Sequence, residues 1–124
     1  MSKKKIIAIT GIRSDYDLMT SVFTEIENNS ELDLGLIVTG THLTNSYGFS
    51  LDEIKKDGFK IIEIVESLLD SDSLSSRVKG MSIQIQCIVQ TLSREKPDML
   101  LVLGDREEAI STALLGTYMN IPVA

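Results

Sequence analysis

Short apolar runs alternate with longer amphipathic segments along the chain. Two runs, at residues 5–10 and 32–39, are rich in Ile, Leu and Val and each is followed by a glycine, which is typical of buried strands. Similar runs at residues 60–65 and 99–103 predict a third and a fourth strand, and residues 121–124 would begin a fifth. This alternation indicates an α/β fold, a Rossmann-like parallel sheet with helices on both faces.

The segments between these runs have helical spacing. Residues 15–28 and 107–119 each predict an amphipathic helix packed on the sheet. Their apolar positions are Leu18, Val22, Phe23 and Ile26 in the first helix and Ala109, Ile110, Ala113, Leu114 and Tyr118 in the second. A shorter helix is predicted at residues 50–56, where Ser50 and Glu53 form a capping-box pattern and Gly58 ends the helix.

The longest predicted helix covers residues 74–94, after an acidic and Ser-rich segment at residues 67–76 that predicts an exposed loop. The apolar residues of this helix alternate steps of four and three and form one narrow stripe, namely Leu74, Val78, Met81, Ile85, Ile88 and Leu92. A stripe of this kind packs against the sheet or seats a partner helix in a dimer.

Composition narrows the class of protein. The chain has 124 residues, of which 43% are hydrophobic, so we expect one domain with its own core rather than a disulfide or metal scaffold. A formal net charge of -6 argues against broad nucleic-acid binding. The first apolar run is too short for a signal peptide or a membrane span, so we expect a cytoplasmic protein without a membrane partner. Cys87 lies among apolar residues, which predicts a buried position.

Ligands of open parallel sheets bind beyond the carboxyl ends of the strands, so the residues after each strand are the candidate site. The first strand is followed by Gly11, Ile12 and Arg13 at a helix start, where backbone N–H groups and a guanidinium suit the phosphates of a nucleotide diphosphate. A plain turn with a surface Arg fits the segment equally well. The glycine spacing of a dinucleotide fingerprint is absent, which disfavours an NAD site.

The loop after the second strand holds His42, the single His of the chain, between Gly40 and Gly48. Its place at the carboxyl end of a strand favours a role in proton transfer, although a lone His is often structural.

A carboxylate and a guanidinium meet after the fourth strand, at Asp105 and Arg106. The pair offers a proton-transfer group beside a cation for a leaving diphosphate. Asp105 as a simple helix cap is the alternative. For Glu107 and Glu108 we expect only the favourable placement of acids at a helix start.

Four segments taken together resemble the hydrolysing UDP-N-acetylglucosamine 2-epimerases of sialic-acid biosynthesis. They are residues 11–16 (GIRSDY), 38–43 (VTGTHL) followed by Tyr47 and Gly48, 102–106 (VLGDR) and 119–124 (MNIPVA). Each segment alone is weak, but their order and spacing match the family across the chain. Non-hydrolysing relatives usually carry Pro-Glu directly after the first Arg, where this chain has Ser14, Asp15 and Tyr16, which favours the hydrolysing branch.

The resemblance implies a fold like that of the GT-B glycosyltransferases, with two Rossmann-like domains around an active-site cleft. It implies conversion of UDP-N-acetylglucosamine and water to N-acetylmannosamine and UDP, by elimination of UDP and hydration of the resulting glycal, without metal or nicotinamide cofactor. By the same resemblance, Arg13 and Arg106 match UDP contacts, Asp105 an acid/base carboxylate and His42 a His implicated in activity. Asp17 stands where some relatives have a UDP-contacting Ser, and a carboxylate there would repel phosphate.

Relatives continue beyond this sequence into a Gly-Gly-Glu segment and a second domain with most of the uridine contacts. We therefore expect residues 1–124 to be one truncated N-terminal Rossmann-like domain of a homo-oligomeric enzyme, with little or no turnover by itself. Two alternatives from other classes are a non-catalytic oligomerisation module, which would use the apolar stripe of residues 74–92, and a flavodoxin-like or other nucleotide-binding α/β domain.

Overall fold

The structure, a computed structural model, describes residues 3–39, 51–66, 73–104 and 106–124. Within these ranges strands and helices alternate without exception. The elements are β1 (Lys4–Thr10), α1 (Arg13–Glu27), β2 (Leu32–Thr39), α2 (Leu51–Lys56), β3 (Ile61–Val65), α3 (Leu74–Glu95), β4 (Met99–Val102) and α4 (Glu107–Met119).

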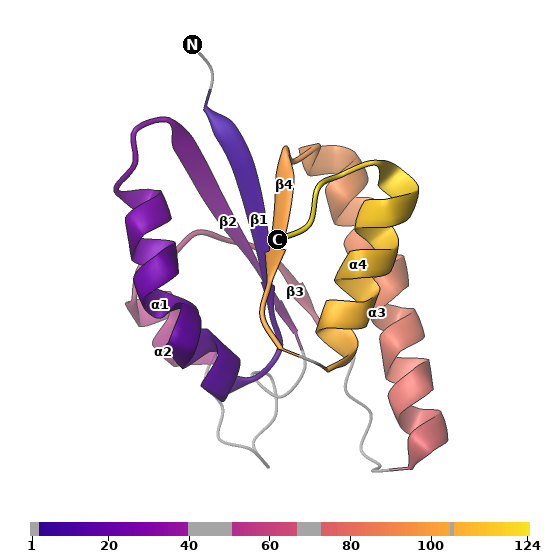
Figure 1. Cartoon of the computed structure of the whole chain (residues 1–124). Helices are drawn as coiled ribbons and strands as arrows, with labels where there is room; N and C mark the ends of the chain where they lie inside the picture. The colour runs from indigo at the N-terminus through magenta and orange to yellow at the C-terminus, as the bar shows by residue number, and fades with distance from the viewer. Residues whose placement is uncertain (1–2, 40–50, 67–72, 105) are drawn as a thin grey trace.

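The four strands form one parallel sheet in the order β3-β2-β1-β4. The chain runs outward from β1 to β3, and α3 then carries it back across the sheet to β4, on the other side of β1. As Figure 1 shows, α1 and α2 cover one face of the sheet and α3 and α4 cover the other. The expected Rossmann-like sheet with helices on both faces is confirmed, and each expected strand from the first to the fourth lies within one residue of its observed bounds.

Each face of the sheet has its own apolar core. On the α1 side, Phe23 is buried against Tyr16 and Phe59, with ring centroids 6.1 Å and 5.7 Å away. The Tyr16 hydroxyl donates a hydrogen bond of 2.5 Å to Asp57. The next residue, Gly58, has a φ of 84° and ends α2 as expected. On the other face, side chains of β1 and β4 pack against Ile88, Leu92 and Leu115. The sheet is therefore covered on both sides by the described helices.

The buried faces predicted for α1 and α4 are partly wrong. In α4 the predicted core positions Ile110, Leu114 and Tyr118 are exposed, and the helix instead buries a face that contains Ser111, Thr112, Leu115 and Gly116. Small residues on this face let the helix lie close to the chain segment that follows it, since a Cβ at Gly116 would overlap the Val123 side chain. In α1, Leu18 and Val22 are exposed, whereas Phe23 is buried.

The stripe of α3 is divided in the structure. Ile88 and Leu92 are buried, whereas Leu74 is 78% exposed and Val78 is 60% exposed. The first turns of α3 extend past the end of the sheet, so these side chains have no sheet surface to cover (Figure 1).

Cys87 is exposed, and its predicted burial is wrong. The buried face of α3 runs through Gln84, Ile88 and Thr91, and Cys87 lies beside it, at the rim of a cleft shared with the edge strand β3.

After α4 the chain returns to the sheet beside β4. Leu100 N–H donates to the Pro122 carbonyl at 2.8 Å, and Ala124 N–H donates to the Leu100 carbonyl at 2.9 Å. One parallel bridge, between Leu100 and Val123, stands where the fifth strand was expected to begin. In the part of the chain described here, no helix is both long and apolar enough to cross a membrane.

Candidate functional site

The candidate site lies where β1 and β4 end side by side. Ile9 of β1 pairs with Val102 of β4, so the turns that contain Gly11 and Gly104 leave the same edge of the sheet. This edge is the lower one in Figure 1. The order of the strands reverses between β1 and β4, and in open α/β sheets the crevice at such a reversal is where ligands bind.

Arg13 is the first residue of α1 and its side chain is about half exposed. Its guanidinium lies 3.1 Å from a carboxylate oxygen of Glu53 and 3.9 Å from one of Asp17. The N-cap residue of α1 is Ile12, whose apolar side chain cannot accept hydrogen bonds from the N–H groups of the first turn. The turn therefore presents backbone donors and a cation, a combination suited to an anionic ligand.

Arg106 is the N-cap residue of α4 and is partly buried. Its Nε atom is buried and has no hydrogen-bond partner among the described residues. A buried guanidinium donor without a partner is costly, and phosphate oxygens are acceptors that match it well. The neighbouring Glu107 does not fill this role, because it forms an ion pair of 2.6 Å with Arg77 of α3.

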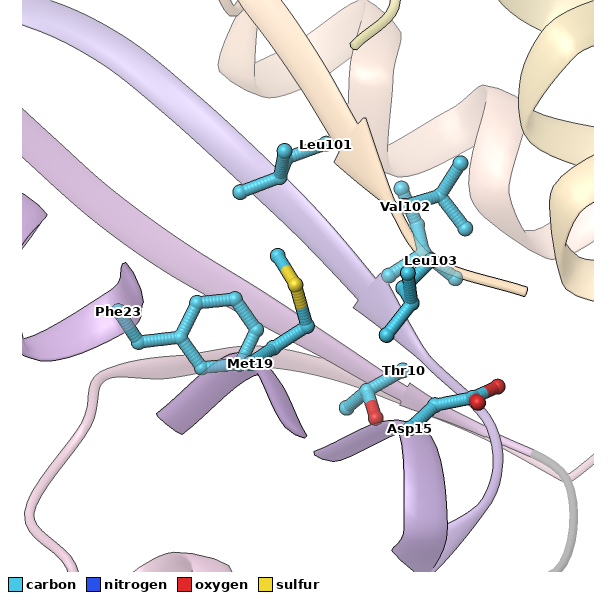
Figure 2. Close-up of a pocket in the computed structure, with 8 residues that line it drawn as sticks. Thr10, Asp15, Met19, Phe23, Leu101, Val102 and Leu103 are labelled. Carbon is cyan, nitrogen blue, oxygen red and sulfur yellow. The ribbon is translucent and has the colours of Figure 1, made fainter. Parts of the chain in front are cut away.

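A small, partly open cavity lies at this end of the sheet. A cavity of about 10 Å³ lies between β1, β4 and α1 and is lined by Thr10, Asp15, Met19, Phe23 and Leu103 among others (Figure 2). A space of this size holds at most one water molecule. A ligand larger than water would therefore lie on the open edge of the sheet, outside this cavity.

Glu108 is a residue whose importance the sequence did not reveal. We expected a surface acid at a helix start, but the side chain is only 6% exposed and contacts the β1–α1 turn at Gly11. Burial raises the pKa of Glu108, although a backbone hydrogen bond, Arg106 and Gln84 oppose the shift. The signal in the sequence was Gly11 itself, because a glycine at a strand end often marks a close approach of another group.

The two other expected site residues, His42 and Asp105, lie outside the described residues. The structure brings together the turns that carry Arg13 and Arg106, because β1 and β4 pair directly. Among the described residues, no three His, Cys, Asp or Glu side chains are grouped closely enough to hold a metal ion.

The sequence from residue 24 to residue 124 matches the family model of UDP-N-acetylglucosamine 2-epimerase. The chain belongs to this family. The resemblance carried by the four segments is thus confirmed. The structure adds the shared edge of the sheet at which the first and third of these segments lie.

Two curated relatives of this epimerase-family chain are named as hydrolysing epimerases. The UDP-N,N'-diacetylbacillosamine 2-epimerase (hydrolyzing) of Legionella pneumophila is 38% identical over 97% of this chain. The GDP/UDP-N,N'-diacetylbacillosamine 2-epimerase (hydrolyzing) of Campylobacter jejuni is 37% identical over 99% of it. In both cases the chain spans 32% of the length of the relative.

The fold agrees with solved epimerase structures. The crystal structure of UDP-GlcNAc 2-epimerase from Neisseria meningitidis bound to UDP-GlcNAc superimposes with a TM-score of 0.77. The match covers 97% of this chain and 31% of the other at 20% identity. The family and the Rossmann-like fold of one third of such an enzyme are therefore shown.

Proposed function

We propose that this chain is the N-terminal Rossmann-like domain of a hydrolysing 2-epimerase that acts on a UDP-linked N-acetylated amino sugar. The observation that carries the proposal is the placement of Arg13 and Arg106 on turns that follow two neighbouring parallel strands, at the reversal of strand order. Two guanidinium groups at one crevice suit the two phosphates of UDP. A cytoplasmic location is part of the same proposal.

In the proposed reaction the bond between C1 of the sugar and the UDP oxygen breaks while a base removes the proton on C2. A double bond forms between C1 and C2, and UDP leaves with its negative charge. Water then adds to C1, and a proton returns to C2 from the opposite face, which inverts that carbon. Arg13 and Arg106 would stabilise the charge of the departing diphosphate, and Asp105 and His42 would transfer the protons.

Two UDP-sugars are candidate substrates in this proposal. The resemblance seen in the sequence points to UDP-N-acetylglucosamine, whereas the two relatives from Legionella and Campylobacter carry names that specify UDP-N,N'-diacetylbacillosamine. Both substrates have an acetamido group on C2 and a diphosphate on C1, so one mechanism serves both.

The product of the reaction tests the proposal. We expect the longer protein that carries this sequence to release UDP and the free C2-inverted sugar from one of the two substrates, as measured by chromatography and NMR. The 124-residue chain alone should show little or no turnover, since the relatives are about three times as long. A UDP-linked epimer as the stable product of the longer protein would contradict the hydrolytic step.

A second candidate function, self-association, rests on an exposed apolar strip. Ile110, Leu114 and Tyr118 lie at intervals of four residues on α4 and are 55%, 42% and 80% exposed; we call them the α4 strip. Leu74 and Val78 on the neighbouring α3 are exposed as well. Apolar patches of this kind are typical of protein interfaces, so we propose that the α4 strip binds a second copy of the chain.

Sedimentation of charged variants tests this interface. In the Ile110→Asp and Leu114→Asp double variant, two carboxylates would be buried without partners, so we expect the dissociation constant of the oligomer to rise by at least ~10-fold. Val22→Asp, at an exposed apolar position of α1, is the matched control and should leave self-association unchanged. A wild-type chain that stays monomeric at high concentration would remove the proposed interface.

A further inference from the structure

Glu108 reaches from the first turn of α4 to the turn that follows β1. A Cβ placed on Gly11 would overlap the Glu108 carboxyl group, so this approach is possible only because residue 11 is glycine. Gln84 Nε2 donates to Glu108 Oε1 at 3.3 Å, and Gln84 Oε1 accepts from Ser111 Oγ at 3.2 Å. The carboxyl is thus held in place by side chains of α3 and α4 and lies against the β1–α1 turn.

Asp15 makes the converse contact. It lies in the first turn of α1, and its carboxyl lies against Gly104 in the β4–α4 turn, where a Cβ would be 2.7 Å from Asp15 Oδ2. Gly104 has a φ of 109°, a backbone conformation that residues with a side chain rarely adopt. In Figure 2 the Asp15 carboxyl lies beside the end of β1 and near Leu103, the residue before this glycine.

The two contacts are reciprocal. Each acid belongs to the helix that follows one strand, and each touches the glycine that follows the neighbouring strand. Both contacts lie next to the positions from which Arg13 and Arg106 project.

We propose that Asp15 and Glu108 are positioning residues that form a brace between the two ligand-binding turns and fix the spacing of Arg13 and Arg106. The inference deepens the proposed function and rests on it for its kinetic consequence. Two guanidinium groups grip one diphosphate only when their separation matches it, and small misplacements at a reacting centre reduce turnover strongly. The acids would therefore act on the reaction through the arginines, without contact to substrate.

A double-variant cycle tests the contact between Glu108 and Gly11. Gly11→Ala places a methyl group where the Glu108 carboxyl lies, and the backbone at residue 11 is not in the left-handed region, so the expected damage comes from that collision. In the longer enzyme, we expect Gly11→Ala to lower kcat/KM for the UDP-sugar at least ~10-fold and Glu108→Ala to lower it several-fold, with kcat affected more than KM. The Gly11→Ala, Glu108→Ala double variant should recover most of the loss due to Gly11→Ala, because the smaller side chain leaves room for the methyl group.

Conservative variants separate positioning from stability. Glu108→Gln and Asp15→Asn keep the shape of each side chain and should retain more activity than the corresponding Ala variants at equal unfolding midpoints. Asp52→Asn, at an exposed acid in the first turn of α2, is the matched control and should retain full activity. Losses that multiply in the double variant, without recovery, would overturn the brace.

The outcome for the brace is distinguishable from the outcome for the proposed function. In urea unfolding and in amide NMR spectra of the chain, Glu108→Ala should relieve the destabilisation and the shift changes that Gly11→Ala causes, whether or not any UDP-sugar is turned over. A wild-type enzyme inactive on UDP-sugars would refute the proposed function, whereas absence of this coupling in unfolding and spectra would refute the brace.

Discussion

Replacement of Asp105 by Asn in the longer enzyme should reduce kcat by about 10²–10⁴-fold, the range typical of a lost general acid or base. Asn has the size of Asp, but it cannot accept and return a proton at neutral pH. The structure assigns the N-cap of α4 to Arg106, so the expected helix-cap alternative for Asp105 is wrong, and the substitution tests the acid/base role. Steady-state kinetics with the UDP-sugar measures the change.

The control for this variant is Asp52→Asn, which neutralises an exposed acid at the start of α2 and should leave kcat within error of the wild type. Unfolding midpoints of both variants should match the wild type. Normal turnover by Asp105→Asn would contradict the acid/base role and leave the proton transfer to another group.

Arg106→Ala should raise KM for the UDP-sugar by about 10–100-fold, since a hydrogen bond to a charged group contributes about 1.5–3 kcal/mol. Within the described part of the chain the buried Nε of Arg106 has no hydrogen-bond partner, so a phosphate oxygen would satisfy this donor. Arg13→Ala should have a smaller effect, because Arg13 already pairs with Glu53 and Asp17, and those pairs oppose its transfer to the ligand.

Arg94→Ala is the matched control for Arg106→Ala. Arg94 lies in the last turn of α3 and forms exposed ion pairs with Glu63 and Glu95, which contribute little in water. Its removal should leave KM unchanged. Equal KM values for Arg106→Ala and the wild type would place the diphosphate elsewhere on the protein.

The order and type of the elements could be predicted from the sequence because local signals agree there. Apolar runs followed by glycine mark the ends of β1 and β2, and Gly58 ends α2 through a positive φ. The residues within each of the four segments of the family resemblance also lie close together in sequence, so each segment could be recognised without knowledge of contacts.

Which face of each helix is buried could not be predicted equally well. In α4 apolar side chains occur nearly all the way round, and close packing through Gly116 decides the orientation, leaving Ile110 and Tyr118 exposed. The same limit applies to Glu108 in the site. Nothing near it in sequence shows that its partner is Gly11, which lies almost a hundred residues earlier and becomes a neighbour only when β4 pairs with β1.

The reaction in D₂O tests the central claim most directly, with the longer enzyme, each UDP-sugar in turn and product analysis by NMR and mass spectrometry. Elimination followed by hydration predicts free UDP and a free sugar that is inverted at C2 and carries one deuterium on that carbon. A product still linked to UDP, or a released sugar with its original configuration and hydrogen at C2, would contradict the account.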